Sequence, residues 1–335
     1  MALVENEGVK SSAAILYELK KEFSNISRIT IIRDLNKLVK LNYLKRIGAG
    51  RNIQYQLSPY FALFAPVNVE QYFQISPDAR VAKDSFNWQI FEVLESIFSP
   101  DEIDKLNQLG SIYRRKIEKQ QPETAKRELE RLIVEFSWKS SVIEGNTYTL
   151  LDTERLIKEG KVAKGRKKEE ATMILNHKKA FDFLLDNLTD LKKVSVSKIE
   201  DVHFLLIKNL DVSRNLRKTP VGIVGTKYRP LGNIHQIRDA LEKTCALINQ
   251  EQNVFAKAII LMLLVAYIQP FTDGNKRVSR LFANGVLMAG GAPPLSLRSI
   301  DEGEYKKAVI LFYEQNNISY FKQLFIQQLE FSVNN

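Results

Sequence analysis

Residues 267–280 read YIQPFTDGNKRVSR and interrupt an apolar segment with proline, glycine and several charged residues. The preceding residues 256–268 predict a buried helix, which ends before Pro270 because proline disfavours helical geometry in the residue before it. Residues 272–275, TDGN, predict a turn, and residues 276–288 predict a second helix. The stretch therefore predicts a helix, a tight turn and another helix.

Such a turn favours a bound anion. Gly274 lets a ligand approach the backbone, and the free N–H groups that start the next helix carry the positive end of its dipole. Arg277 and Arg280 are three residues apart, so both guanidinium groups can reach the same side, and Asp273 can hold Mg²⁺ beside phosphate oxygens. The structural alternative makes Asp273 a helix cap and the arginines a solvated face, and spacing alone leaves both open.

Two motifs carry a family resemblance. Residues 269–280, QPFTDGNKRVSR, resemble the active-site motif of the Fic (Fido) family, His-x-Phe-x-(Asp/Glu)-Gly-Asn-(Gly/Lys)-Arg-x-x-Arg, at every position except the first. Upstream, SSVIEGN resembles the inhibitory motif of the family, in which Ser140, Glu144 and Gly145 match. The resemblance extends over roughly residues 90–330. It implies a mainly helical fold and a protein adenylyltransferase, which moves AMP from ATP to protein hydroxyls with Mg²⁺.

The resemblance also implies residue roles. Asp273 would hold Mg²⁺, Phe271 would anchor the turn, and Glu144 would block ATP, because a carboxylate and a triphosphate cannot share one guanidinium. Residues 219–233, TPVGIVGTKYRPLGN, predict a short β-hairpin where the family keeps the flap that aligns a target peptide. The implied nucleotide-binding residues are Gly274, Asn275, Lys276, Arg277 and Arg280, and the implied flap residues are Gly225, Thr226 and Tyr228.

Gln269 is the departure from the motif, because it stands where the family has its general-base histidine. An amide cannot take a proton at neutral pH, so AMP transfer is expected to fall by roughly 10² to 10⁴ while phosphate binding survives. None of His177, His203 and His235 is assigned as a substitute base. A lysine at the motif position of Lys276 is also found in the Doc toxin, which resembles Fic proteins yet phosphorylates its target. A Doc-like phosphotransferase therefore remains an alternative function.

Residues 1–60 predict a small winged helix-turn-helix domain. Residues 12–23 predict one helix, Ser27 can cap a second, and two short strands meet around residues 48–50. The first helix of such a domain would fall in MALVENEG, residues 1–8, and is almost absent. Residues 1–60 hold ten Lys and Arg against five Asp and Glu, which favours DNA contact. The DNA-contact candidates are Arg28, Thr30, Arg33 and Lys37; protein docking is the alternative.

Residues 61–90 predict a connecting segment, and residues 91–335 the helical domain with its inhibitory helix. The apolar run before Gln269 is shorter than the roughly 20 residues that span a bilayer, and no membrane contact is expected. Cys245 is the lone cysteine and no secretory signal opens the chain, which predicts a cytoplasmic protein. A second hypothesis is a non-catalytic nucleotide sensor that acts through the winged helix. The target protein, the DNA site and homo-oligomerisation stay undetermined by the sequence.

Overall fold

The computed structural model describes residues 9–335, which divide into two compact units. The described residues up to Val67 and residues 315–319 form the N-terminal unit; residues 68–314 and 320–335 form the larger unit. The division falls inside the predicted connecting segment, residues 61–90. The first helix of a winged helix would fall in residues 1–8. These residues lie outside the part of the chain that the structure describes.

The N-terminal unit packs two helices on a small antiparallel sheet of strand order β1-β3-β2, in which Lys45 pairs with Gln56. The hydroxyls of Ser11 and Ser27 cap its two longer helices, as predicted for Ser27. Its elements are β1 (Lys10–Ser11), α2 (Ser12–Glu22), α3 (Arg28–Lys40), β2 (Leu44–Ile47), η1 (Gly50–Asn52), β3 (Gln54–Leu57) and α4 (Pro59–Phe64). Its core consists of Ile15, Ile31, Leu35, Leu44 and Tyr55. The predicted pair of helices and pair of strands is confirmed, and β1 adds a third strand.

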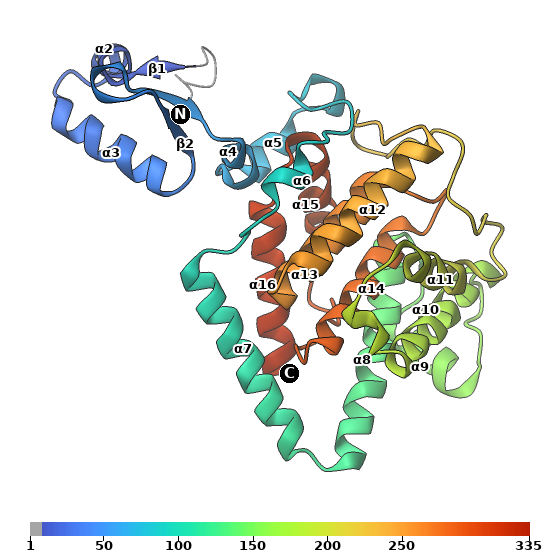
Figure 1. Cartoon of the computed structure of the whole chain (residues 1–335). Coiled ribbons are helices and arrows are strands. Elements are labelled where there is room, and N and C mark those ends of the chain that lie inside the picture. Colours follow the sequence, from blue (N-terminus) through green and yellow to red (C-terminus); the bar gives the residue numbers. More distant parts are fainter. Residues whose placement is uncertain (1–8) are drawn as a thin grey trace. The chain divides into compact units, whose positions relative to one another are not determined.

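The larger unit is helical, which confirms the predicted mainly α fold (Figure 1). Its first elements are short: α5 (Val69–Gln74), η2 (Pro77–Ala79) and α6 (Ile90–Val93). The longer ones are α7 (Pro100–Lys119), α8 (Pro122–Ile143), α9 (Leu150–Glu159), α10 (Lys168–Asp186), α11 (Val196–Ile207), α12 (Ile234–Gln250), α13 (Val254–Ile268), α14 (Asn275–Ala289), α15 (Glu302–Gln315) and α16 (Ser319–Asn334), with η3 (Asp190–Lys192) between α10 and α11.

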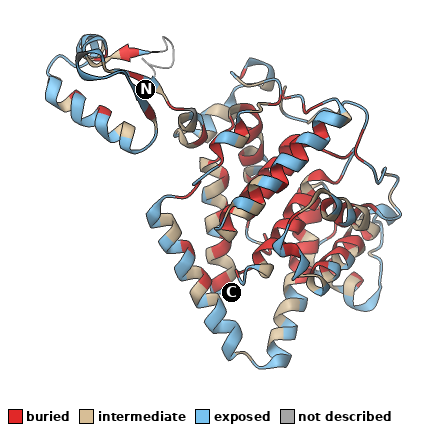
Figure 2. Ribbon diagram, in the orientation of Figure 1, coloured by how far each residue is buried: buried red, intermediate tan, exposed pale blue. Residues whose placement is uncertain are grey.

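Helices α13 and α14 form the centre of this unit and pack along each other (Figure 1). Every residue of α13 except Val254 and Lys257 is buried, and Figure 2 shows both helices in the buried colour over most of their length. Helices α8, α10 and α11 pack against α14, while α12 packs against α13. Within residues 9–335, no helix combines the length and the apolar character needed to cross a membrane. The turn between α13 and α14 is therefore held by the best-packed part of the unit.

The predicted β-hairpin over residues 219–233 is wrong. The segment forms an extended loop with one turn at residues 224–225, and its only strand-like pairing among the described residues is a parallel bridge from Arg229 to Ser85. The buried Arg217 guanidinium donates hydrogen bonds to the carbonyl oxygens of Thr219 and Leu231. In a hairpin, these carbonyl oxygens would accept from backbone N–H groups of the paired strand. Side-chain donors thus replace a strand ladder in this loop.

Candidate functional site

A cavity of about 410 Å³ opens over the turn between α13 and α14. Its walls come from four parts of the larger unit: the end of α8, the loop at residues 222–224, the turn with the start of α14, and α15. The lining residues are Ile143, Glu144, Gly145, Gly222, Ile223, Val224, Gln269, Thr272, Asp273, Gly274, Asn275, Lys276, Arg277, Tyr305, Lys306, Val309, Ile310 and Tyr313. The structure therefore brings the two predicted motifs and the predicted target loop to one cavity.

The turn is fixed by its own side chains. The Asn275 side chain accepts from the Phe271 N–H at 2.8 Å and donates to the Phe271 carbonyl, also at 2.8 Å. Phe271 is fully buried and stacks on the His203 ring with centroids 3.6 Å apart, which confirms its anchoring role in this fold. Gly274 has φ +83°, and a Cβ there would lie 3.3 Å from the His203 ring, so glycine suits both backbone and space.

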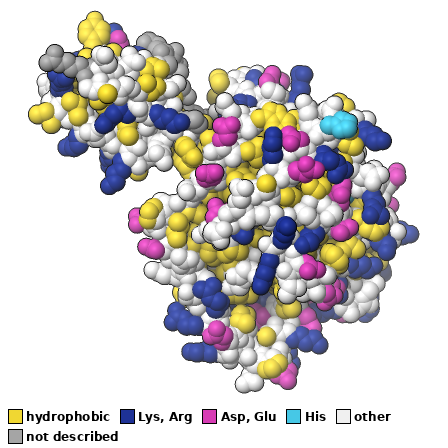
Figure 3. Space-filling view, in the orientation of Figure 1, with side chains coloured by type: hydrophobic (Ala, Val, Ile, Leu, Met, Phe, Trp, Pro, Cys, Tyr) yellow, Lys and Arg dark blue, Asp and Glu magenta, His cyan; other side chains and the backbone are white. Residues whose placement is uncertain are grey.

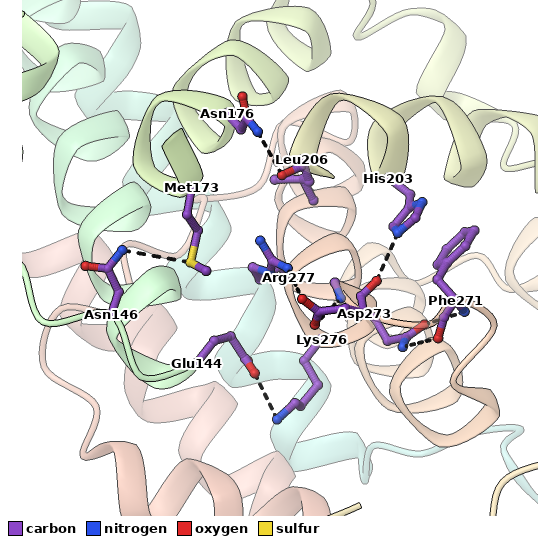
Figure 4. Close-up of polar contacts among 12 residues, drawn as sticks. Glu144, Asn146, Met173, Asn176, His203, Leu206, Phe271, Asp273, Lys276 and Arg277 are labelled. Atoms are coloured by element: carbon purple, nitrogen blue, oxygen red, sulfur yellow. Dashed lines mark hydrogen bonds and ion pairs between the residues drawn. The ribbon is translucent and has the colours of Figure 1, made fainter. Parts of the chain in front are cut away.

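Helix α14 begins at Asn275, and its first three residues line the cavity. The first N–H groups of a helix have no partner within the helix, so they present donors and a partial positive charge. Asp273 accepts from Gly274 N–H at 2.6 Å, and its other carboxylate oxygen pairs with Arg277 at 2.8 Å (Figure 4). This is the geometry of an anion site at a helix N-terminus.

Both arginines keep an unused donor. Arg277 and Arg280 are each 1% exposed, and the Nη1 atom of each has no hydrogen-bond partner within residues 9–335. Leaving a buried charged donor unsatisfied is costly, so such atoms are expected to have a partner in another state of the protein. Phosphate oxygens are the acceptors that guanidinium groups bind best. Arg277 lines the cavity, whereas Arg280 does not.

Glu144, at the C-terminal end of α8, lies between two cations. Its Oε1 is 2.9 Å from Arg280 Nη2, and its Oε2 is 3.0 Å from Lys276 Nζ; Figure 4 shows the Lys276 and Glu144 side chains pointing toward each other. The Arg280 contact is a close ion pair between two side chains that are mostly buried. The predicted pair of Glu144 and Arg280 is thus present, and Lys276 is a second cation on the same carboxylate.

The protonation equilibria of this group favour the charged forms. Burial on its own would raise the pKa of Glu144, but the charges of Arg280 and Lys276 outweigh it and lower the pKa to about 2. Burial likewise opposes the charged form of Arg280, yet the Glu144 carboxylate raises its pKa. Glu144 is therefore a carboxylate throughout the neutral range.

His177 forms a hydrogen bond with Ser140. Its Nδ1 donates to the Met173 carbonyl at 3.0 Å, which leaves Nε2 to accept from the Ser140 hydroxyl, also at 3.0 Å. Ser140 in turn accepts from Arg280 Nε at 3.1 Å and offers its carbonyl to Arg280 Nη2 at 2.9 Å. Burial lowers the pKa of His177 to about 3, so it stays neutral. Ser140 therefore contacts Arg280 directly, whereas Gly145 borders the cavity.

Gln269 ends α13 in a left-handed conformation with φ 50° and is 8% exposed. Its amide donates to the Ala266 carbonyl at 2.6 Å, and its Oε1 accepts from Asn275 at 2.9 Å. The amide is therefore held in place at the cavity wall. It has no basic atom, which leaves the sequence-based concern about the missing base standing.

None of the three histidines lies on the cavity wall. His177 binds the Ser140 hydroxyl, and His203 Nε2 donates to the Asp273 carbonyl at 2.9 Å. Burial lowers the pKa of His203 to about 4. His235 is exposed near the start of α12. These positions offer no replacement for the missing base.

The target-loop candidates separate in the structure. Gly225 has φ +86° at the turn, and residues 222–224 just before it line the cavity. Thr226 accepts from Tyr228 N–H at 3.1 Å. Tyr228 is 1% exposed and its hydroxyl donates to the Tyr267 carbonyl at 2.9 Å, so it anchors the loop rather than facing a partner.

The DNA-contact candidates lie in the N-terminal unit, on α3. Arg28, Arg33 and Lys37 are exposed, whereas Thr30 forms part of the helix cap through its contact with Ser27 Oγ at 3.0 Å. Figure 3 shows several Lys and Arg side chains on the part of this unit where α3 lies, with few Asp or Glu in that view. Three of the four candidates are therefore exposed, and Arg33 and Lys37 lie one turn apart on the same face of α3.

The sequence analysis did not identify Tyr305 and Tyr313 as cavity-lining residues. It also gave His177 no role beside Ser140. Tyr305 and Tyr313 on α15 line the cavity, and Tyr313 lies 3.5 Å from the Gln269 amide nitrogen. Their spacing of eight residues puts both on one face of a helix, which was the available signal. For His177, a lone histidine on a mainly apolar helix gives no signal of its partner Ser140, 37 positions away.

Comparison with known proteins gives a match inside the larger unit. The Fic/DOC family model matches residues 193–287. The protein adenylyltransferase fic-1 of Caenorhabditis elegans is 28% identical over 172 residues, 49% of this chain and 33% of that protein. The protein adenylyltransferase Fic of Drosophila melanogaster is 25% identical over 169 residues, 49% of this chain and 34% of that protein. The chain spans about a third of the length of these relatives.

Solved structures share the fold. A Fic-1 fragment from C. elegans aligns with a TM-score of 0.58 at 21% identity and covers 70% of each chain. A Fic domain protein from Bacteroides thetaiotaomicron aligns with a TM-score of 0.57 at 19% identity, covering 69% of this chain and 96% of its own. The family match contains the turn, Gln269, Arg277 and Arg280. Residues 193–287 of this chain therefore match the Fic/DOC family model, and the chain shares the helical fold of these solved structures.

Proposed function

We propose that the larger unit binds ATP in this cavity and is a protein adenylyltransferase held back by two of its own residues. The observation that carries the proposal is Glu144, which pairs with Arg280 and Lys276 beside the helix N-terminus and the unused guanidinium donors. The names of the fic-1 and Fic relatives support AMP transfer to proteins as the reaction class.

The residues present fit a nucleoside triphosphate. The N–H groups of residues 275–277, with the spare Nη1 donors of Arg277 and Arg280, would take up phosphate oxygens. No group of three or more metal-ligating side chains occurs within residues 9–335. Mg²⁺ typically needs only one or two carboxylates beside substrate phosphates, and the Asp273 side chain is 63% exposed at the turn. Asp273 would hold the metal, which neutralises phosphate charge when bound.

Glu144 defines the closed state of the site, in which its carboxylate pairs with Arg280 and Lys276. Its carboxylate occupies the two cations that a triphosphate would use, so ATP must displace it or bind in a non-productive position. Both contacts are ion pairs to cations that phosphate oxygens can also bind, so ATP and the carboxylate compete for them. Ser140 accepts from Arg280 Nε and Nη2 and is itself hydrogen-bonded to His177, so that the guanidinium keeps its position when Glu144 leaves.

Gln269 limits the chemical step. AMP transfer requires removal of the proton from the acceptor hydroxyl, and the amide at this position can orient that hydroxyl but cannot take its proton. Phosphotransfer remains a second chemistry for the same site because Lys276 lies beside the phosphate-binding helix end. Labelling ATP at the α- or γ-phosphate separates the two reactions.

The N-terminal unit suggests a second function, in which the nucleotide site acts as a sensor and the winged helix binds DNA or a protein. The observation that favours it is the set of exposed basic side chains on α3, in which Arg33 and Lys37 lie one turn apart on the same face. The buried lone Cys245 fits the expected reducing, cytoplasmic location.

The proposal is tested by calorimetric titration of ATP with Mg²⁺ into the parent chain and Glu144→Gly. Glu144→Gly is expected to bind at least about tenfold more tightly, because it removes the carboxylate that competes for the cations. Glu135→Gln is the matched control: Glu135 lies on the same helix, is buried and pairs with Arg298 at 2.7 Å, away from the cavity wall. Equal affinity in the parent and Glu144→Gly, or no binding by either, would refute the proposal.

A further inference from the structure

Arg80 and Glu314 form a buried ion pair outside the matched Fic/DOC residues. Arg80 Nη1 lies 3.1 Å from Glu314 Oε2, and the two side chains are 3% and 0% exposed. The same carboxylate oxygen accepts from Tyr72 at 2.6 Å, and the Arg80 guanidinium lies over the Phe73 ring at 5.0 Å. Burying both charges is costly, and such pairs are often no more stabilising than apolar side chains of similar volume. Stability alone therefore does not account for this pair.

The second arm of Arg80 reaches the target loop. Its Nη2 donates to the Gly225 carbonyl at 2.6 Å, at the turn that follows the cavity-lining residues 222–224. The chain beyond Arg80 then follows the loop: Arg229 N–H donates to the Asp84 carbonyl at 2.9 Å, and Arg229 bridges to Ser85. Residues 80–85 and 225–229 are thus joined side by side within the larger unit.

The loop that Arg80 holds presents an open backbone edge. Within the described part of the chain, residues 221–223 pair with no strand, and residues 224–225 form a turn. Val224 is 96% exposed, and Gly222 and Val224 both border the cavity. An extended peptide can add to such an edge through main-chain hydrogen bonds. A single turn without a strand partner needs another element to keep its shape.

We propose that Arg80, oriented by Glu314, is a positioning residue that holds the backbone edge at residues 221–223 in the extended shape a target peptide would pair with. Glu314 fixes one side of the guanidinium, so that the other side points at the Gly225 carbonyl. Glu314 also belongs to α15, whose Ile310 and Tyr313 line the cavity, so the same pair ties the loop to the cavity wall. The role in target binding rests on the proposed function; the control of loop shape does not.

The test uses the full chain and measures tryptic cleavage of the Lys227–Tyr228 bond by mass spectrometry, under conditions where the protein remains folded. Cleavage within a folded protein tracks local opening. Arg80→Met removes the donor to Gly225 and is expected to raise the cleavage rate at this bond at least about tenfold. The double variant Arg80→Met with Glu314→Met removes the unpaired carboxylate as well, so it should keep the fold and still show the faster cleavage.

Arg80→Lys separates charge from geometry. A lysine keeps the cation for Glu314 but has one terminal nitrogen, so it cannot hold Glu314 and Gly225 with separate arms. Arg80→Lys should unfold at the same temperature as the parent, while its Lys227–Tyr228 bond is cleaved as fast as in Arg80→Met. Lys322→Met is the matched control, because Lys322 also joins a carboxylate, Glu102 at 2.9 Å, to a backbone carbonyl, Ile97 at 3.1 Å. It should leave cleavage at Lys227 unchanged.

ATP affinity is measured on the same variants in the Glu144→Gly background, because residues 222–224 of the loop line the cavity proposed to bind ATP. If Glu144→Gly binds no ATP, the proposed function fails while the cleavage result still decides the role of Arg80. The inference is overturned if the Lys227 bond is cleaved at the parent rate in Arg80→Met and the double variant, or if Lys322→Met accelerates it equally.

Discussion

The Glu144 carboxylate lies 2.9 Å from Arg280, although 136 positions separate the two residues along the chain. The pair joins the end of α8 to the first turns of α14 and places a negative charge where the cavity otherwise presents cations and helix N–H groups. A site with this charge arrangement has two states, one with the carboxylate bound and one with an anionic ligand bound. The expected effect of Glu144→Gly on ATP binding follows from the competition between these states.

Lys276 should have opposite effects in the two states. With Glu144 present, Lys276 pairs with it at 3.0 Å, so Lys276→Ala weakens the closed state and should tighten ATP binding about threefold. In the Glu144→Gly background the lysine is free to meet phosphate, and the same change should weaken ATP binding by about threefold or more. Calorimetric titration of the four chains measures both effects. The same sign in both backgrounds would show that Lys276 does not switch partners.

Glu144 should also give stability a characteristic dependence on pH. Its pKa is lowered from 4.5 to about 2, with the charges of Arg280 and Lys276 outweighing burial. A depressed carboxylate pKa contributes stability above the unfolded-state pKa and loses it as pH falls through the folded-state pKa. The free energy of unfolding of the parent should therefore exceed that of Glu144→Gln at pH 7 by an amount on the order of a few kcal/mol.

The difference should persist down to about pH 4.5 and shrink as pH falls toward 2, the two pKa values for this group. Urea unfolding of both chains across this range measures it. Glu135→Gln provides a reference for the loss of a different paired carboxylate on α8. A constant difference between the parent and Glu144→Gln over the whole acid range would show that the pair with Arg280 and Lys276 does not form.

The structure also shows how far the sequence could be read. Pro270 and Gly274 act on their immediate neighbours, so the helix, turn and helix around them were predictable from local rules alone. The pair of Glu144 and Arg280 has no local signal, and only the resemblance to a family motif brought those residues together. Composition cannot show which distant side chain will meet a given residue.

The hairpin prediction for residues 219–233 was wrong for the same reason, because contacts with distant residues decide the structure of this segment. Residues 219–233 carry the alternation and the glycine turn that predict two strands, but a strand forms only where its backbone groups pair with another strand. Here the carbonyls of Thr219 and Gly225 are taken by Arg217 and Arg80, which are buried. Arg80 lies 145 positions from Gly225, outside the reach of any periodicity in the loop.

DNA binding by the N-terminal unit predicts a strong effect of salt. A fluorescent 30-base-pair duplex is a suitable probe, and its affinity should fall steeply between about 50 and 200 mM salt because phosphate contacts release counterions. Arg33→Ala should weaken binding and reduce the salt slope by about one unit, since Arg33 is exposed on α3. Lys20→Ala removes an exposed charge from α2 and should have the smaller effect. No binding at low salt, or equal effects of both substitutions, would exclude this use of α3.

The central claim is that this is an adenylyltransferase site held back by Glu144 and Gln269. The most direct measurement is transfer of label from α-labelled ATP with Mg²⁺ to the chain itself or to lysate proteins. It compares the parent, Glu144→Gly, Gln269→His and the double variant, with γ-labelled ATP in parallel. Histidine tolerates the left-handed backbone of position 269 better than most residues and supplies the missing base.

The account predicts the strongest α-label transfer in the double variant, roughly 10² or more above Glu144→Gly, and none from γ-labelled ATP. A double variant that binds ATP but transfers no more label than the parent, or that transfers only the γ-phosphate, would contradict it.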